Sequence, residues 1–230
     1  MEIIYEDNHL IAVNKNGHEL VQGDKTGDAS LADLLKTWLK EKYAKPGNVF
    51  VGVTHRLDRP VTGVVVFAKT SKALSRMNEL FRTGEIKKTY WAIVRNRPPE
   101  IEQELTHWLV RNEKQNKSYV CAPSQKPDAR KAVLHYRLIA QSEHYYLLEI
   151  DLQTGRHHQI RCQLAAIGCP IRGDLKYGAD RSNPDGGISL HARRISFVHP
   201  VSKQPVDIVA PVPDEPLWKA LTEGVPKLAF

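Results

Sequence analysis

The chain has 230 residues, enough for one large domain or two small ones, and its 41% hydrophobic content is that of an ordinary globular protein. No apolar stretch approaches membrane-spanning length, and the N-terminus lacks the basic and apolar regions of a signal peptide. Three cysteines without a CxxC pair argue against a disulfide framework, so we expect a protein of the reducing cytoplasm.

The chain is basic, with a formal net charge of +7 and an isoelectric point near 9.3. Such a charge suits a polyanionic partner, because lysines and arginines that contact phosphates release condensed counterions. It can equally belong to a solvated basic surface, so charge alone leaves both interpretations open.

The first third of the chain predicts strands and two helices. Residues 3–5 and 10–13 flank a turn at 7–8 and predict a hairpin. Ser30 is a candidate N-cap for a helix whose apolar face comprises Leu31, Leu34, Leu35, Trp38 and Leu39. The β-branched run at residues 64–68 predicts a buried strand. Ser71 is the candidate N-cap of a second helix, which Gly84 can end with a positive φ.

The remainder predicts mostly strands, at residues 89–94, 133–139, 145–151, 188–198 and 206–209. Two short helices are expected at residues 160–167, closed by Gly168, and at 216–221. The polar, lysine- and arginine-rich segment 111–131 can be a hairpin insertion, a mobile loop that contacts a nucleic acid, or a solvated surface excursion.

Strands outnumber helices and often follow one another directly. We therefore predict an α+β fold with a mixed, mainly antiparallel central sheet and flanking helices, in a single domain over residues 1–230.

One motif, His55-Arg56-Leu57-Asp58, lies just ahead of the predicted strand at 64–68. Pro60 cannot donate to a ladder and biases Arg59 toward extended geometry. Asp58 is thus expected in a shaped loop that leads into a rigid strand, where a fold can hold one acid in a fixed place for chemistry.

The motif resembles the active-site motif of the RluA-type pseudouridine synthases, which carry His-Arg-Leu-Asp, a Thr-Ser-Gly or similar triplet, and an apolar strand ending in Ala-Lys. Two later segments agree in order: residues 88–92 (KTYWA) resemble the family's Lys-x-Tyr-x-Ala strand, and residues 154–161 (TGRHHQIR) with the positions up to Gly173-Asp174 resemble its third motif. The resemblance covers nearly the whole chain.

The resemblance implies a pseudouridine synthase fold whose long central sheet is crossed by an active-site cleft. It implies isomerisation of uridine to pseudouridine in ribosomal or transfer RNA, without a cofactor or a metal. Many members carry a small RNA-binding domain ahead of this fold. The family's first motif begins here with residues 5–10 (YEDNHL), so we expect recognition to use the catalytic domain itself. We also expect a monomer that has no membrane partner.

The resemblance also implies three catalytic residues. Asp58 matches the catalytic aspartate, and Arg161 matches the arginine that pairs with it. A guanidinium opposes the rise in pKa that burial imposes on a carboxylate. Tyr90 matches the active-site tyrosine, whose ring can stack on an extruded uracil and whose hydroxyl can handle a proton. Their structural alternatives are a turn-capping aspartate, a helix-surface arginine and an ordinary strand aromatic.

RNA binding is assigned to Arg56, His55 and Arg156. Arg56 lies two residues before Asp58, so in an extended chain both side chains share one face. Arg56 could fill the space that a flipped uridine vacates or bind a phosphate, and a plain salt bridge is its alternative. A hydrogen-bonded structural role is at least as good an interpretation for His55.

Several other chemistries are disfavoured. A hydrolytic glycosidase typically needs two carboxylates, whereas the active-site motif at residues 55–58 supplies only Asp58. The adjacent pair His157-His158 diverges on a helix, which makes a metal site improbable. Gly63, Gly155 and Gly173 fit backbone hinges better than phosphate cradles. A catalytically silent RNA-binding protein on the same scaffold remains the alternative function, although it would need none of the three catalytic residues.

The chain departs from the family pattern at two places. Thr62 stands where serine is more common, which keeps a hydroxyl and adds a methyl group. Asn16 stands where the first motif often has proline, so the geometry of that loop is open.

Overall fold

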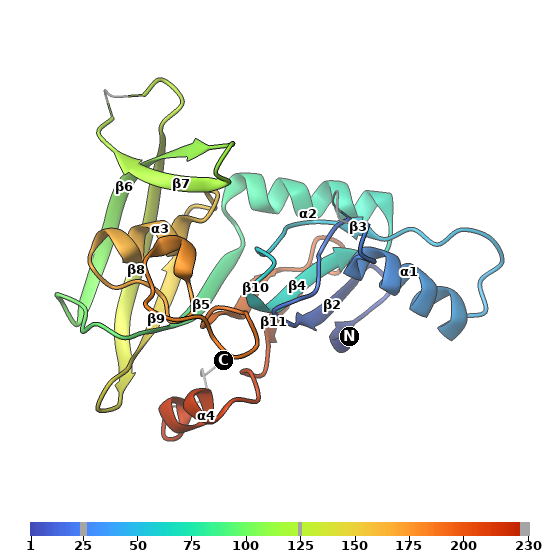
Figure 1. Ribbon diagram of the computed structural model, residues 1–230. Helices are drawn as coiled ribbons and strands as arrows, with labels where there is room; N and C mark the ends of the chain where they lie inside the picture. Colours follow the sequence, from blue (N-terminus) through green and yellow to red (C-terminus); the bar gives the residue numbers. More distant parts are fainter. Residues whose placement is uncertain (24–26, 124–125, 226–230) are drawn as a thin grey trace. The chain divides into compact units, whose positions relative to one another are not determined.

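The computed structural model describes residues 1–23, 27–123 and 126–225 (Figure 1). The elements, in chain order, are β1 (Glu2–Glu6), β2 (Leu10–Lys15), α1 (Leu31–Lys42), β3 (Gly52–Val53), β4 (Thr62–Ala68), α2 (Ser71–Thr83), β5 (Lys87–Val94), β6 (Glu102–Asn112), β7 (Lys117–Cys121), β8 (Arg130–Gln141), β9 (Tyr146–Leu152), α3 (Gln159–Ala166), a 3-10 turn η1 (Leu175–Tyr177), β10 (Leu190–Val198), β11 (Pro205–Val209) and α4 (Pro216–Thr222).

Contacts within the chain divide it into two compact units. Unit 1 comprises Met1–Ile86 and Ala192–Pro211, and unit 2 comprises Lys87–His191 and Val212–Phe230. The assignment of residues 1–230 to a single domain stays a prediction.

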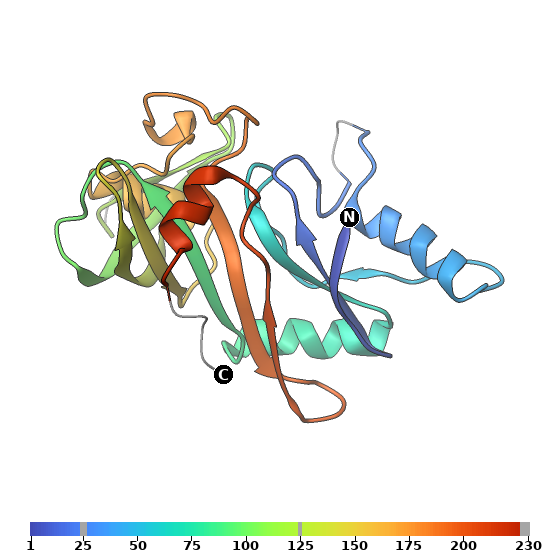
Figure 2. The ribbon, with the colours of Figure 1, turned by 90° about the horizontal axis from the view of Figure 1, so that it is seen from below.

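In unit 1 the strands lie in the order β1-β2-β4-β10, with β3 paired to β4 and β11 paired to β10 (Figure 2). β2 and β4 are antiparallel, in a register that runs from Leu10 opposite Ala68 to Lys15 opposite Gly63. The buried face of α1 packs on alternate residues of these two strands, and this core contains Leu31, Leu35, Leu39, Ile11, Val13, Val65 and Phe67.

In unit 2 the strands lie in the order β5-β9-β8-β6-β7, and each of these neighbours pairs antiparallel. α3 packs against β6 and β7. The terminal helix α4 buries Trp218 and Leu221 against Trp91, Ile93 and Leu147. Both units consist mainly of antiparallel strands with few helices, which confirms the α+β class; the active-site cleft stays a prediction.

Most of the expected elements are confirmed, including the hairpin, the buried strand at 64–68 and the late strands. Ser30 is the N-cap of α1, since its hydroxyl accepts a bond from the backbone N–H of Asp33. Gly84 ends α2 with φ 75°. No helix among residues 1–23, 27–123 and 126–225 combines the length and the apolar composition that crossing a bilayer requires.

Two details of the predicted helices are wrong. The N-cap of α2 is Thr70 rather than Ser71, because the Thr70 hydroxyl accepts from the backbone N–H of Ala73 at 3.1 Å. Leu34 does not share the apolar face of α1: it is 41% exposed, whereas Leu35 is fully buried.

The segment 111–131 is largely a hairpin. β6 and β7 pair from Trp108 opposite Cys121 to Asn112 opposite Lys117, and β8 begins at Arg130. Residues 124–125, which the segment includes, lie outside the described residues. β6 itself was not predicted, because only Leu105 and Leu109 along its 11 residues are buried and its charged residues hide the alternation.

Candidate active site

The loop that carries the His-Arg-Leu-Asp motif, residues 54–61 (the motif loop), is fastened to β4 at its start. The Thr54 hydroxyl donates to the Val66 carbonyl at 2.7 Å, and the Val66 N–H donates to Nε2 of His55 at 3.0 Å. The side chains of Thr54 and His55, which directly follow the short strand β3, thus bind both the carbonyl and the N–H of Val66 on β4. The ring of His55 also contacts that of Phe81, with centroids 5.0 Å apart.

The end of the motif loop is held by Lys15, the last residue of β2, which is fully buried. Its ammonium group donates to the carbonyls of Arg59 at 2.8 Å and Val61 at 2.7 Å, and to that of its neighbour Asn16 at 2.8 Å. Burial lowers the pKa of Lys15 to about 8, and the charges of Glu19 and Asp58 oppose this decrease.

Asp58 lies between these two fastened ends. The Val61 N–H donates to the Asp58 carbonyl at 3.0 Å, which closes a turn, and Leu57 packs against the core beneath α1. Asp58 itself is half-buried. The prediction of a shaped loop ahead of a rigid strand is therefore confirmed.

The two other motif residues lie differently. Arg56 is exposed, and residues 54–58 do not form a strand, so the shared-face argument for Arg56 and Asp58 loses its premise. His55 has the structural role described above, which supports the structural interpretation. RNA contacts by these two residues stay predictions.

Gly63, the second residue of β4, adopts φ 113°, and a Cβ at this position would lie 2.3 Å from the carbonyl oxygen of Ala192. The close approach of β4 and β10 therefore requires glycine here. Gly63 therefore serves close backbone packing, and its role as a hinge stays a prediction.

In unit 2, Arg161 lies on α3 and is buried, with its guanidinium paired to Asp174. Nε donates to Oδ2 of Asp174 at 2.7 Å and Nη2 donates to Oδ1 at 2.9 Å, which is a bidentate pair between two buried side chains. The guanidinium carbon also lies 5.1 Å from the centroid of the Tyr177 ring. Arg161 is thus not a helix-surface residue.

Asp174 is a functional candidate that the sequence reasoning did not assign. Its only signal was its place in the Gly173-Asp174 pair at the end of the third motif. Asp174 binds Nε and Nη2 of the guanidinium, so it fixes the direction in which the remaining N–H groups of Arg161 point. We assign it as a positioning residue for Arg161.

The residues before α3 form a second hydrogen-bonded cluster. The hydroxyl of Tyr177 accepts from the backbone N–H of Ser118 at 2.8 Å and lies 3.0 Å from Nδ1 of His158. His157 stacks on His158, with centroids 3.8 Å apart, and both residues precede the first residue of α3. The expectation that this pair diverges on a helix is therefore wrong. Among the described residues, no group of three or more potential ligand side chains could hold a metal ion.

Tyr90 lies on β5 opposite Ile150 of β9 and is 9% exposed. Lys88 lies two residues earlier and so shares its face of the strand. Burial lowers the pKa of Lys88. The Lys-x-Tyr pattern in the sequence could have indicated that Lys88 lies on the same strand face as Tyr90.

Arg156 is exposed, and its Nε donates to the Lys131 carbonyl at 3.0 Å.

The predicted site residues therefore fall into both units. Asp58, Arg56 and His55 lie in unit 1, whereas Tyr90, Arg156 and Arg161 lie in unit 2. The pairing of Asp58 with Arg161 stays a prediction.

Comparisons with known proteins agree with the family that these motifs resemble. The family model described as RNA pseudouridylate synthase matches residues 9–166. An uncharacterized RNA pseudouridine synthase of Synechocystis is 33% identical over 93% of this chain, and a tRNA pseudouridine synthase C of Pectobacterium carotovorum is 33% identical over 98% of it. The chain spans 66% and 61% of the lengths of these two relatives.

A solved structure agrees with the fold. Human RNA pseudouridylate synthase domain containing 4 superposes with a TM-score of 0.78 and 25% identity, over 93% of this chain and 89% of that chain.

Proposed function

Because this chain belongs to the RNA pseudouridylate synthase family, we propose that it converts uridine to pseudouridine in structured RNA, either transfer or ribosomal. The observation that carries the proposal is Asp58, set in a loop that Thr54, His55 and Lys15 fasten at both ends. A carboxylate held in this way suits a reaction that needs one acid in a fixed place.

The reaction breaks the bond from N1 to C1′, turns the base, and joins C5 to C1′. The C5 proton leaves and N1 gains one, so substrate and product are isomers and no donor enters. A carboxylate can act as a nucleophile, as a base toward the sugar, or as electrostatic support for positive charge on C1′. Each of these roles requires Asp58 to be ionised.

The other two catalytic residues complete the proposal. Arg161, oriented by Asp174, would hold Asp58 ionised. Tyr90 would stack on the extruded uracil and handle the proton near C5. We also propose that the protein acts as a monomer in the cytoplasm; the cysteines, none in a disulfide, fit that compartment.

The test is release of tritium from RNA that contains 5-tritiated uridine, because formation of the bond from C5 to C1′ displaces the C5 hydrogen. Release together with pseudouridine in the RNA supports the proposal. Accumulation of free uracil would instead identify a hydrolase. RNA binding without either product would identify a catalytically silent protein.

Tyr90→Phe separates the two roles of the tyrosine. The ring remains and the hydroxyl is lost, so proton handling predicts a decrease in turnover of about 10² to 10⁴-fold with RNA affinity unchanged. Single-turnover tritium release measures the first and filter binding the second. A near-normal rate would assign Tyr90 to stacking alone.

The pKa of Lys15 predicts a pH limit on turnover. Only the protonated amine offers three N–H donors to its three carbonyl acceptors. Because burial lowers this pKa to about 8, we expect turnover to fall as the pH rises through about 8 and the motif loop loses one bond. Rates of tritium release between pH 7 and 9.5 would show this decrease.

Unfolding does not account for that decrease. The pKa is about 8 in the folded chain and near 10.5 in the unfolded chain, so the unfolded chain binds more protons between these values. This group therefore adds to the free energy of unfolding as the pH rises from 8 to 10.5. Circular dichroism should show folded protein at pH 9, and Lys15→Met should lack the pH step. A flat rate profile in the parent would contradict the role of the ammonium group.

A further inference from the structure

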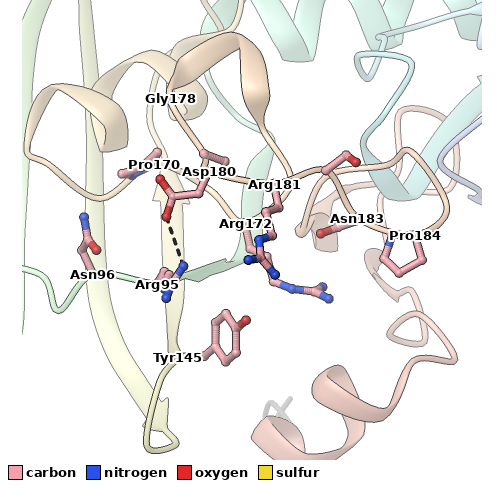
Figure 3. Close-up of a pocket in the computed structure, with 13 residues that line it drawn as sticks. Arg95, Asn96, Tyr145, Pro170, Arg172, Gly178, Asp180, Arg181, Asn183 and Pro184 are labelled. Carbon is pink, nitrogen blue, oxygen red and sulfur yellow. Dashed lines mark hydrogen bonds and ion pairs between the residues drawn. The ribbon is translucent and has the colours of Figure 1, made fainter.

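Unit 2 contains a pocket of about 520 Å³ that none of the preceding functions uses. Three arginines line it, and each comes from a different segment: Arg95 follows β5, Arg172 follows the residue that bridges to β5, and Arg181 lies in the loop after η1. Figure 3 shows these side chains around one space, with the ring of Tyr145 at its edge. We call this site the arginine pocket.

Hydrogen bonds fix the backbone segments that carry the arginine pocket. The Arg172 N–H donates to the Ile93 carbonyl and the Ser189 N–H donates to the Arg172 carbonyl, both at 2.9 Å, so this segment is tied to β5. Asn183 is buried and donates to the Ser189 hydroxyl at 3.2 Å. A Cβ on Gly173 would lie 2.6 Å from the Asn183 side chain, so glycine is needed to seat the loop that carries Arg181.

The charges of the arginine pocket are only partly compensated. Arg172 is bound to Glu215 at 2.8 Å. Arg95 pairs with Asp180 at 3.1 Å, but these side chains are 63% and 74% exposed, and an exposed ion pair of this kind contributes little. In the part of the chain that the structure describes, no carboxylate pairs with Arg181. A stronger anion could therefore replace Asp180 on Arg95 and bind Arg181 at the same time.

Guanidinium groups match the oxygens of phosphate in bidentate geometry, and an aromatic ring beside them provides a surface on which a base can stack. The ring of Tyr145 already lies 5.8 Å from the guanidinium carbon of Arg172. Arg95, Asp180 and Arg181 form an exposed rim. An open rim suits a nucleic-acid strand that passes across the pocket better than a small molecule, which a pocket usually encloses.

We propose that the arginine pocket binds a backbone phosphate of the RNA substrate, with a neighbouring base on Tyr145. The inference rests on the proposed function, because it takes the substrate to be RNA. Asp180 then acts as the resident anion that RNA displaces from Arg95.

The test measures RNA binding without turnover, in the Asp58→Asn background, by fluorescence anisotropy at several salt concentrations. Arg95→Gln and Arg181→Gln should each raise Kd roughly three- to tenfold and reduce the slope of log K against log salt by about 0.7 to 0.9. Asp180→Asn should lower Kd. Arg82→Gln, which removes an equal charge from a residue 72% exposed on α2, should change neither quantity.

Melting temperatures of the variants control for folding. Unchanged Kd and salt slope in both arginine variants would overturn the inference, whatever the rate of tritium release by the parent enzyme. If uridine 5′-monophosphate bound the parent and the arginine variants lost only that binding, the pocket would be a site for a free nucleotide and the RNA proposal would be wrong. If the parent released no tritium but the arginine variants still weakened RNA binding, the proposed reaction would be rejected and the inference about the arginine pocket would be supported.

Discussion

Asp58→Asn should abolish pseudouridine formation, with turnover lowered by at least about 10³-fold, while the RNA affinity and the melting temperature stay near those of the parent. The substitution removes the negative charge that a nucleophile, a base and an electrostatic stabiliser all require. It keeps the size and shape of the side chain. Single-turnover tritium release and filter binding measure the two quantities.

The loop geometry explains why the fold should tolerate this change. The bonds that hold the motif loop come from Thr54, His55 and Lys15 to backbone groups of Val66, Arg59 and Val61. None of these bonds is made by the Asp58 side chain. One side effect is expected: the Asp58 charge opposes the decrease in the pKa of Lys15, so its removal should lower that pKa further.

Asp28→Asn is the matched control. Asp28 is exposed and pairs with Arg59 of the same loop at 2.9 Å, yet it lies outside the motif. Its loss should leave turnover within a fewfold of the parent value, because an exposed ion pair contributes roughly 0 to 1 kcal/mol. Undiminished turnover in Asp58→Asn would reject the catalytic assignment.

Features that depend on neighbours in sequence could be predicted well. Ser30, Gly84 and the run at 64–68 act through local bonding, positive φ and alternation, and the structure confirms all three. The choice between Thr70 and Ser71 failed because two adjacent hydroxyl residues satisfy the same capping rule. β6 was missed because its charged side chains conceal a strand that buries few residues.

Features that depend on distant contacts could not be predicted. Lys15 lies 44 and 46 residues from the carbonyls of Arg59 and Val61, and nothing near it in sequence indicates a fully buried ammonium group. The same holds for Asp174, which was visible as part of a motif but had no assigned partner. The arginine pocket draws its residues from separate segments between Arg95 and Pro184, so no local pattern indicates it.

Asp174→Ala should lower both activity and stability, because it removes the buried carboxylate that forms a bidentate pair with the Arg161 guanidinium. Breaking a buried pair in this way costs about 3 to 5 kcal/mol. Arg161→Ala should be equally costly, since Asp174 is 1% exposed. Urea unfolding measures the free energy of unfolding for each variant.

The double variant Arg161→Met, Asp174→Leu separates stability from catalysis. It removes both buried charges and keeps apolar volume, so most of the lost stability should return. Activity should stay as low as in the single variants, because the cation proposed to hold Asp58 ionised is absent. Recovery of tritium release together with stability would mean that the pair serves only the fold.

Arg161→Lys completes this set. It keeps the positive charge but cannot form the bidentate contact with Asp174, in which Nε and Nη2 lie 2.7 and 2.9 Å from the two carboxylate oxygens. If orientation by Asp174 matters, turnover should remain far below the parent value although a cation is present. If charge alone sufficed, lysine would restore much of the rate and Asp174 would lose its role as a positioning residue.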